Sequence, residues 1–222
     1  MINKIKRHKK LIVGIVTLSV LYFLSRVINL TVLPIFTDEA IYVRWAQIAK
    51  QDSSWRFISL TDGKQPMLIW GGMVLLRFIS DPLAAVRMVS VLCGFFSMIG
   101  IGLAARELFR STKIGIFSSI LYLVYPFTVM YDRMALMDSM VAMFSIWSLY
   151  LSVLLVKKPR LDTALLFGMV LGGGVLTKTS GFLNIYLLPA TLLLFDWQKR
   201  DRTARLFTWL IFAMLEIGRA HV

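Results

Sequence analysis

The feature that most constrains the fold is a series of long apolar stretches separated by short charged segments. A helix needs about 20 predominantly apolar residues to cross the hydrocarbon core of a bilayer. Apolar residues make up 58% of the 222 residues and the mean hydropathy is +0.73, whereas a typical soluble domain is about 45–50% apolar. The sequence therefore predicts an all-α fold, a polytopic transmembrane helical bundle. We expect crossings at residues 11–33, 88–105, 114–130, 139–156, 163–177 and 182–196, followed by a shorter seventh apolar run.

One further apolar run, residues 66–79, is too short to be assigned by hydropathy alone. Its 14 residues suit an interfacial helix better than a crossing. If this run crossed the membrane, the basic segments RELFRSTK (106–113) and KKPR (157–160) would face outward, against the positive-inside rule. We therefore expect residues 66–79 to lie along the membrane, inside one long outward loop at 34–87.

The charge of the connecting segments then sets the predicted orientation. Fifteen Lys and Arg residues lie in the predicted cytoplasmic segments, which are 1–10, 106–113, 157–160 and 197–205. The short outward loops carry one each, Arg133 in 131–138 and Lys178 in 177–181. The positive-inside rule predicts a multi-pass protein of the cell membrane with a cytoplasmic N-terminus.

The same distribution explains the net charge of +13 without a nucleic-acid partner. The basic residues cluster in short loops between apolar runs, as expected for a chain that crosses the membrane several times. The single cysteine, Cys93, lies inside an apolar run, so no disulfide framework is expected.

The last seven residues, EIGRAHV (216–222), resemble the translation of a common sequencing adapter. The apolar run before them, 206–215, is also far shorter than the roughly 20 residues that a crossing needs. We therefore expect residues 1–215 to be the N-terminal part of a longer transmembrane domain, with six complete crossings and an incomplete seventh. We expect residues 216–222 to be an artefactual tail.

The outward loop has the pattern of two juxtamembrane helices joined by a polar connector. Thr37 is a suitable helix cap, and the next two residues place carboxylates in the first turn, where the helix dipole favours anions. Ile41, Trp45 and Ile48 follow at helical spacing and predict an apolar stripe. The turn TDGKQP comes next, and Pro66 is expected to open the second helix.

Four segments place ionisable groups at helix ends on the predicted outer side. They are TDEA (37–40), DGKQPM (62–67), YDRMALMDS (131–139) and LTKTSG (176–181). Carboxylates and cations that converge beside lipid suit sugar transfer from a lipid-linked phosphate. Cations stabilise the phosphate that leaves, and one carboxylate is enough as a general base for the acceptor hydroxyl.

The order of these motifs resembles the GT-C superfamily of glycosyltransferases. Within it the sequence is most similar to the dolichyl-phosphate-mannose protein mannosyltransferases and the bacterial aminoarabinose transferases of lipid A. The likeness extends over about residues 10–200, from the DE pair through GKQPM, an Arg–Ser pair at 87 and 90, ALMDS and TKTSG. It implies an inverting glycosyltransferase that moves a sugar from a polyprenyl-phosphate donor to a hydroxyl of a protein, glycan or lipid on the extracytoplasmic side.

The resemblance also implies roles for the matching residues. Asp38 would be the catalytic base and Glu39 its supporting partner, while Lys64 would bind the donor phosphate. The remaining substrate-binding residues would be Arg133, Asp138 and Lys178, all at the same cavity.

The segment around Lys64 departs from the family pattern. In similar enzymes Glu or His often precedes the lysine and two prolines follow it, whereas here Gly63 precedes Lys64 and Gln65 replaces one proline. A metal ligand that some relatives carry before the lysine is therefore missing. No residue is assigned to a metal, and a divalent cation stays open as a cofactor.

Purely structural interpretations stay open for each charged residue. Asp38 and Glu39 could serve only as helix-cap charges, Lys64 only as a cation that extends to the surface, and Lys178 only as a charge at a helix end. Arg133 could simply pair with Asp132 or Asp138.

Two arginines lie within or beside apolar helices. Arg87 is expected to be an anchor at the outer interface, and Arg26 either extends to the surface or faces the cavity.

Two other functional classes also stay open. A secondary transporter would place charges near the bilayer midplane, whereas nearly all ionisable residues are expected at helix ends. A non-catalytic membrane scaffold would need no catalytic carboxylate at all.

Overall fold

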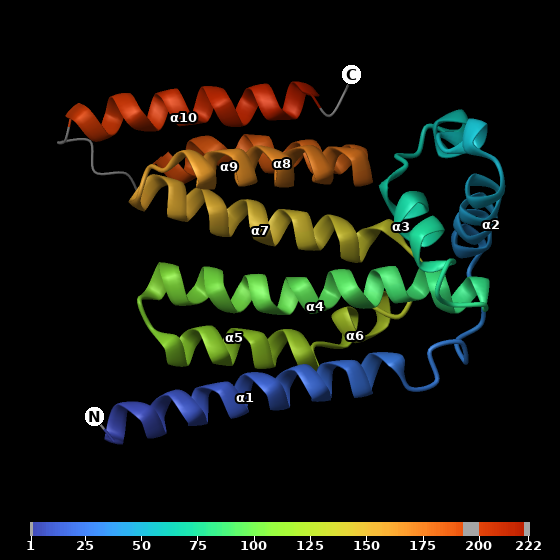
Figure 1. Ribbon diagram of the computed structural model, residues 1–222, viewed down its shortest axis with the longest axis horizontal. Helices are drawn as coiled ribbons and strands as arrows, with labels where there is room; N and C mark the ends of the chain where they lie inside the picture. Colours follow the sequence, from blue (N-terminus) through green and yellow to red (C-terminus); the bar gives the residue numbers. More distant parts are fainter. Residues whose placement is uncertain (1, 193–199, 220–222) are drawn as a thin grey trace.

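The computed structural model describes residues 2–192 and 200–219, and this part of the chain is entirely helical (Figure 1). Residues 193–199, where the predicted sixth crossing ends and the last basic segment begins, lie outside the described residues, as do residues 220–222 of the predicted tail. The α-helices are α1 (Ile2–Val27), α2 (Thr37–Gln51), α3 (Met67–Leu75), α4 (Pro82–Phe109), α5 (Thr112–Val124), α6 (Pro126–Tyr131), α7 (Met137–Lys157), α8 (Leu161–Thr177), α9 (Leu183–Leu192) and α10 (Arg200–Arg219). Three short 3-10 helices, η1 (Ser53–Trp55), η2 (Ile58–Asp62) and η3 (Thr179–Phe182), complete the described elements.

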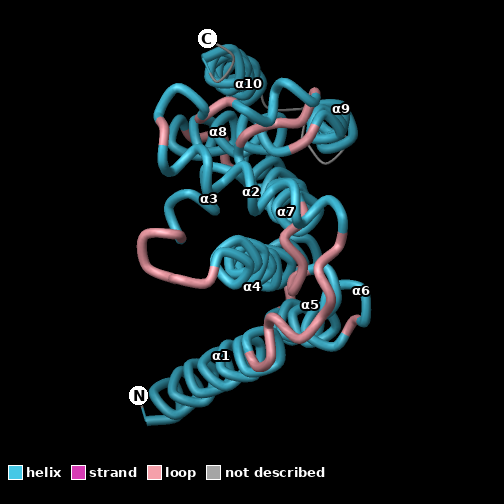
Figure 2. Tube along the Cα trace, turned by 90° about the vertical axis from the view of Figure 1, so that its right-hand side faces the viewer, coloured by secondary structure: helices cyan, strands magenta, loops and turns pink. Residues whose placement is uncertain are grey.

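The long helices pack side by side with roughly parallel axes, and Figure 2 shows them nearly end on. α4 lies at the centre between α5 and α7, α8 packs on the far side of α7, and α10 packs on α8. Within the described part of the chain, two helices, α4 and α7, are long and apolar enough to cross a membrane. Residues 12–27, 112–124, 161–177 and 204–213 form shorter apolar helical stretches, so the count of six crossings stays a prediction.

The two helices of the first loop lie at one end of this bundle, where α2 runs across the ends of the long helices (Figure 1). α3 is only nine residues long and is too short to cross a membrane. It packs between α2 and α4, and Gly72 allows this because an added Cβ would come within 3.0–3.1 Å of Val86 and Ala46. A short helix therefore follows Pro66, and its place along the membrane stays a prediction.

The predicted apolar stripe on α2 is not its buried face. Ile41, Trp45 and Ile48 are only partly buried, and the buried residues are instead Glu39, Tyr42, Val43, Ala46 and Ala49. The helix turns this face inward because the Glu39 carboxylate has partners inside the bundle, which hydropathy alone does not reveal. Phe36 rather than Thr37 is the N-cap, and Pro66 likewise caps α3 rather than occupying its first turn.

Among the described residues, three of the predicted cytoplasmic segments lie at one end of the bundle and the four candidate motifs lie at the other. The N-terminus and the α4–α5 and α7–α8 connections share one end, opposite α2 and α3 (Figure 1). This arrangement is the one that the loop-charge argument requires. Which end faces the cytoplasm stays a prediction.

The crossing predicted at residues 114–130 is broken. α5 ends at Val124, and α6 begins at Pro126 after an extended Tyr125. Proline has no N–H, so the carbonyls of the preceding turn need other donors. The Thr128 hydroxyl donates to the Tyr122 carbonyl at 2.6 Å, and the Arg26 guanidinium donates to the Leu123 carbonyl at 2.8 Å. The first crossing also differs from its prediction, because α1 ends at Val27 rather than near residue 33.

Candidate functional site

Asp38 and Lys64 meet at the end of the bundle that carries α2. Asp38 lies in the first turn of α2, and Lys64 follows the 3-10 helix η2. The Lys64 Nζ lies 3.7 Å from Asp38 Oδ1 and 3.4 Å from Asp62 Oδ2. The Asp38 side chain is 45% exposed, so this carboxylate is accessible. The structure therefore brings the predicted base and the predicted phosphate-binding cation together, although they are 26 positions apart in the sequence.

Lys64 lies over two aromatic rings whose role the sequence analysis did not identify. Its Nζ lies 5.1 Å from the Tyr42 ring centre and 5.9 Å from that of Trp45, both on α2, and cation–π attraction stabilises such an arrangement. Partial desolvation lowers the pKa of Lys64, but Tyr42, Asp38 and Asp62 oppose this effect and hold the pKa above its ordinary value. Lys64 is therefore a permanent cation at the site.

Gly63 has a conformational reason to precede Lys64. Its φ of 66° lies in the left-handed region, which glycine adopts without strain. The turn lets the Lys64 amide donate to the Ser59 carbonyl at 3.0 Å. A Glu or His at this position, as in some similar enzymes, would be strained in this turn.

Glu39, the predicted partner of the base, is completely buried rather than exposed at the site. Arg87 on α4 binds it with two hydrogen bonds, Nε to Oε1 at 2.9 Å and Nη2 to Oε2 at 2.8 Å. The backbone amides of Phe36 and Ala135 donate to the same carboxylate at 3.0 and 2.6 Å. Glu39 therefore fixes the first turn of α2, and Asp38 with it, to α4 and to the segment before α7.

The expectation for Arg87 is wrong, because its side chain is 0% exposed and does not anchor at an interface. Besides Glu39 it donates to the carbonyls of Leu30 at 2.8 Å and Leu33 at 3.1 Å. A sequence signal was available: Arg87 has apolar neighbours on both sides in a membrane helix, and such a charge usually faces the bundle interior with a partner.

Glu39 also predicts how the fold responds to acid. Burial raises the pKa of Glu39, but the hydrogen bonds from Arg87, Phe36 and Ala135 outweigh burial and hold the pKa below its ordinary value. The unfolded pKa is about 4.3, so this contribution to stability is complete above that pH and is lost as the pH falls through the lower folded pKa. We expect tryptophan fluorescence of the purified protein to show no unfolding step from Glu39 between about pH 5 and 8. A step in that range that disappears in a Glu39→Leu/Arg87→Met variant would contradict this.

Arg133 and Asp132 lie differently from their predicted places. Arg133 pairs with neither Asp132 nor Asp138, and donates instead to the carbonyls of Ile28 and Asn29 at 3.0 and 2.7 Å. Asp132 was expected in an outward loop but is only 1% exposed. It pairs with Arg26 of α1, whose side chain is also buried, so Arg26 neither reaches the surface nor faces the site.

Asp138 and Lys178 form the second charged pair of the candidate site. Asp138 lies in the first turn of α7, and Lys178 is the C-cap of α8. Lys178 Nζ donates to Asp138 Oδ1 at 3.0 Å, and both side chains are about half exposed. Burial raises the pKa of Tyr42, and the charge of Lys178 lowers it together with that of Lys64. Both cations therefore act on the same tyrosine, and the two pairs lie at the same end of the bundle.

Other features of the described residues add no catalytic group. Within the described ranges no three His, Cys, Asp or Glu side chains come together. A cavity of ≈ 180 Å³ lies elsewhere, between α1, α4 and α5. Its lining is mostly aliphatic and includes a single titratable side chain, Arg106.

The chain was compared with protein families, curated proteins and solved structures. No curated protein and no solved structure matches the chain. A family described as dolichyl-phosphate-mannose-protein mannosyltransferase matches residues 64–217, which include Lys64, Arg87, Asp138 and Lys178. Asp38 and Glu39 lie before the matched region. The match covers more than half of the chain, and its family consists of membrane proteins of the GT-C fold that use polyprenyl-phosphate sugars. The chain belongs to the dolichyl-phosphate-mannose-protein mannosyltransferase family.

Proposed function

We propose that this protein is an inverting glycosyltransferase that moves a sugar from a polyprenyl-phosphate donor to an acceptor hydroxyl on the extracytoplasmic side of the membrane. The observation that carries the proposal is the contact between an accessible carboxylate, Asp38, and a cation, Lys64, at the end of a lipid-embedded bundle. The lipid tail of the donor would lie in the bilayer and place its phosphate at this level.

Asp38 is the proposed general base. It lies in the first turn of α2, at the positive end of the helix dipole, and it is exposed enough to reach an acceptor hydroxyl. In the transfer step the acceptor oxygen attacks the anomeric carbon and Asp38 takes the hydroxyl proton. The bond from the anomeric carbon to the phosphate oxygen breaks, and the polyprenyl phosphate leaves with the electron pair. Attack from the face opposite the phosphate inverts the anomeric configuration.

The cations of the site are proposed to hold the phosphate. Lys64 carries a full charge beside Asp38, and Lys178 pairs with Asp138 at the same end of the bundle. A phosphate that leaves as a stable anion needs positive charge rather than a proton donor. Arg133 fits this role less well, because its guanidinium donates to the carbonyls of Ile28 and Asn29.

The proposal is tested by transfer of labelled sugar from polyprenyl-phosphate donors in membranes that contain the full-length protein. We expect product only with a lipid-phosphate donor, and not with a nucleotide sugar alone. A panel of donors and acceptors that gives no transfer above protein-free membranes would refute the proposal.

Lys64 gives the first specific prediction. Lys64→Ala removes one charge-assisted contact with the donor phosphate and is expected to raise the KM for the donor by about 10- to 100-fold. Lys64→Arg keeps the charge and should cause a smaller rise. Lys158→Ala is the matched control, since it removes an exposed lysine from the α7–α8 connection. Equal KM values for Lys64→Ala and Lys64→Arg would contradict the phosphate role.

A secondary transporter has one observation in its favour, the buried pair Arg26–Asp132. Charges inside a membrane bundle often mark a transport pathway, although these two also lie at helix ends, Arg26 in the last turn of α1 and Asp132 at the C-cap of α6. However, Tyr22, Tyr122 and Ser139 bond to Asp132, and the Arg26 guanidinium bonds to protein oxygens. These bonds favour a fixed structural pair over a transport site.

A further inference from the structure

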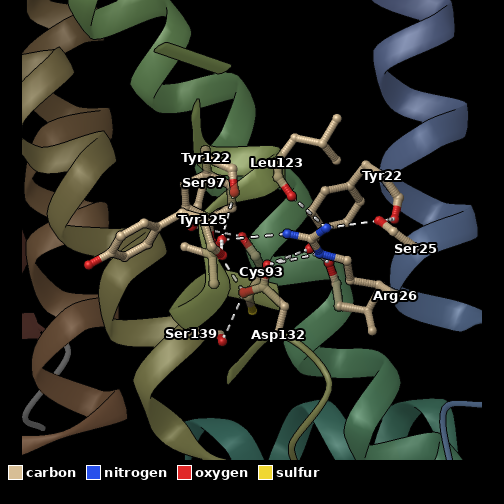
Figure 3. Close-up of polar contacts among 12 residues, drawn as sticks. Tyr22, Ser25, Arg26, Cys93, Ser97, Tyr122, Leu123, Tyr125, Asp132 and Ser139 are labelled. Carbon is tan, nitrogen blue, oxygen red and sulfur yellow. Dashed lines mark hydrogen bonds and ion pairs between the residues drawn. The ribbon is translucent and has the colours of Figure 1, made fainter. Parts of the chain in front are cut away.

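The Asp132 carboxylate is buried where the helices α1, α5 and α7 meet (Figure 3). Its carboxylate accepts hydrogen bonds from Tyr22 of α1 at 3.0 Å, Tyr122 of α5 at 3.2 Å and Ser139 of α7 at 3.0 Å. The Arg26 Nε lies 3.7 Å away. Asp132 therefore joins α1, α5 and α7 at one point beside α4.

Gly94 of α4 provides the space for this carboxylate. A Cβ added at Gly94 would overlap the Asp132 carboxylate and the Tyr22 hydroxyl. Gly94 is 12 residues after Pro82, the first residue of α4, which corresponds to about 18 Å along the helix at ~1.5 Å per residue. The Asp132 carboxylate is therefore well inside the bundle, away from the exposed charges of the candidate site.

The short segment Asp132–Leu136 begins at this buried carboxylate and connects it to the candidate site. Arg133 holds it to the carbonyls of Ile28 and Asn29. The Ala135 amide donates to Glu39 Oε1 at 2.6 Å, and Ser90 donates to the Leu136 carbonyl at 3.3 Å. Four of its five residues thus carry a bond to another part of the fold.

The segment Asp132–Leu136 is connected to both charged pairs of the site. Through the Ala135 amide the segment holds Glu39, which is adjacent to the proposed base Asp38. The C-terminal end of the segment continues directly into α7, where Asp138 pairs with Lys178. A change in the position of the segment would therefore alter the separation of Asp38 and Asp138.

We propose that Asp132 is a positioning residue for sugar transfer, because it fixes the segment Asp132–Leu136 that sets Asp38, through Glu39, relative to the Asp138–Lys178 pair. This inference rests on the proposed function. Asp132 itself touches neither charged pair of the candidate site, and it acts only through the peptide chain that it holds.

The first test compares kcat and KM of the full-length protein with and without the Asp132 carboxylate. Asp132→Asn keeps the shape but weakens the acceptor for Tyr22, Tyr122 and Ser139. Misplacing a catalytic group by about 1 Å can cost about 100-fold in rate, so we expect kcat to fall by about 10- to 100-fold. The KM for the donor should change less than about threefold, since the cations that hold the phosphate remain.

Two further variants protect this test against simple misfolding. Arg26→Gln/Asp132→Asn removes both charges together and leaves no unpaired buried ion, and it should show the same fall in kcat. Ser139→Ala deletes one bond to Asp132 and should lower kcat by about 2- to 10-fold. Ser119→Ala is its matched control, because Ser119 makes a similar bond to the Met98 carbonyl away from the segment, and kcat should stay at the wild-type value.

The outcomes separate this inference from the proposed function. Wild-type kcat per folded molecule in the Asp132→Asn and double variants, with activity still lost in Asp38→Asn, would overturn the positioning role alone. Activity retained in Asp38→Asn would instead overturn the proposed base, whatever Asp132→Asn does. A selective fall in kcat for Asp132→Asn and Ser139→Ala, but not for Ser119→Ala, would support the inference.

Discussion

Replacing Asp38 by Asn in the full-length protein is expected to lower kcat for sugar transfer by about 10²- to 10⁴-fold. Asparagine has nearly the shape of aspartate but cannot accept the proton of the acceptor hydroxyl. The amount of protein in the membrane should be unchanged, because the Asp38 side chain is 45% exposed and its contact with Lys64 is a loose 3.7 Å. The measurement is transfer of labelled sugar per mole of protein at saturating donor.

Asp62→Asn is the matched control for this variant. Asp62 also lies near Lys64, at 3.4 Å, and its side chain is 57% exposed. Both substitutions therefore remove one carboxylate beside the same cation, and only Asp38→Asn removes the proposed base. We expect Asp62→Asn to keep kcat within about threefold of wild type, as for other exposed ion pairs. Similar losses in the two variants would mean that the carboxylates act only through Lys64, and the base assignment would fail.

Much of the bundle could be predicted because hydropathy and loop charge report directly on it. The runs at 139–156 and 163–177 correspond closely to α7 and α8. The short helix after Pro66 followed from a count of basic residues in loops, since crossing the membrane there would have turned RELFRSTK and KKPR outward. These features depend on composition over many residues, and they tolerate an error at any one of them.

The bonds of individual buried charges could not be predicted in the same way. Hydropathy places Asp132 near the end of an apolar run, where exposure is the ordinary expectation. The apolar neighbours of Arg87 indicate burial, but they do not identify its partner. The actual environment of both residues depends on partners about 50 and 110 positions away, Glu39 for Arg87 and Tyr22 for Asp132. The break at Pro126 depends in the same way on distant donors, because Arg26 bonds to the Leu123 carbonyl. A single sequence contains no direct record of such pairs.

The motifs of the candidate site could be identified in the sequence, but the separate roles of Asp38 and Glu39 could not. The sequence grouped Asp38 and Glu39 as an exposed catalytic pair. In the fold, helical geometry points adjacent residues in different directions, so that Asp38 is accessible while Glu39 is 0% exposed. Adjacent carboxylates in one turn of a helix can therefore serve one chemical and one structural purpose.

That structural purpose predicts the largest effect on stability. Arg87→Met would leave the Glu39 carboxylate buried without its cation, and removing one partner of a buried ion pair costs about 3–5 kcal/mol. We expect most of the Arg87→Met protein to be lost from the membrane, or to unfold at a much lower temperature. The measurement is the amount and the melting temperature of detergent-solubilised protein, both determined by size-exclusion chromatography with fluorescence detection.

The control is an arginine–carboxylate pair of similar geometry outside the bundle. Arg160 lies 2.6 Å from Asp162, but these side chains are 68% and 58% exposed, so Arg160→Met should cost only about 0–1 kcal/mol. Glu39→Leu/Arg87→Met removes both buried charges and should recover folded protein. Its first turn of α2 would still lack the bonds from Arg87 and Ala135, so Asp38 would lose its fixed position and transfer should stay low. Recovery of both folding and transfer would mean that Glu39 has no part in placing the base, while equal stability of Arg87→Met and Arg160→Met would contradict the buried pair itself.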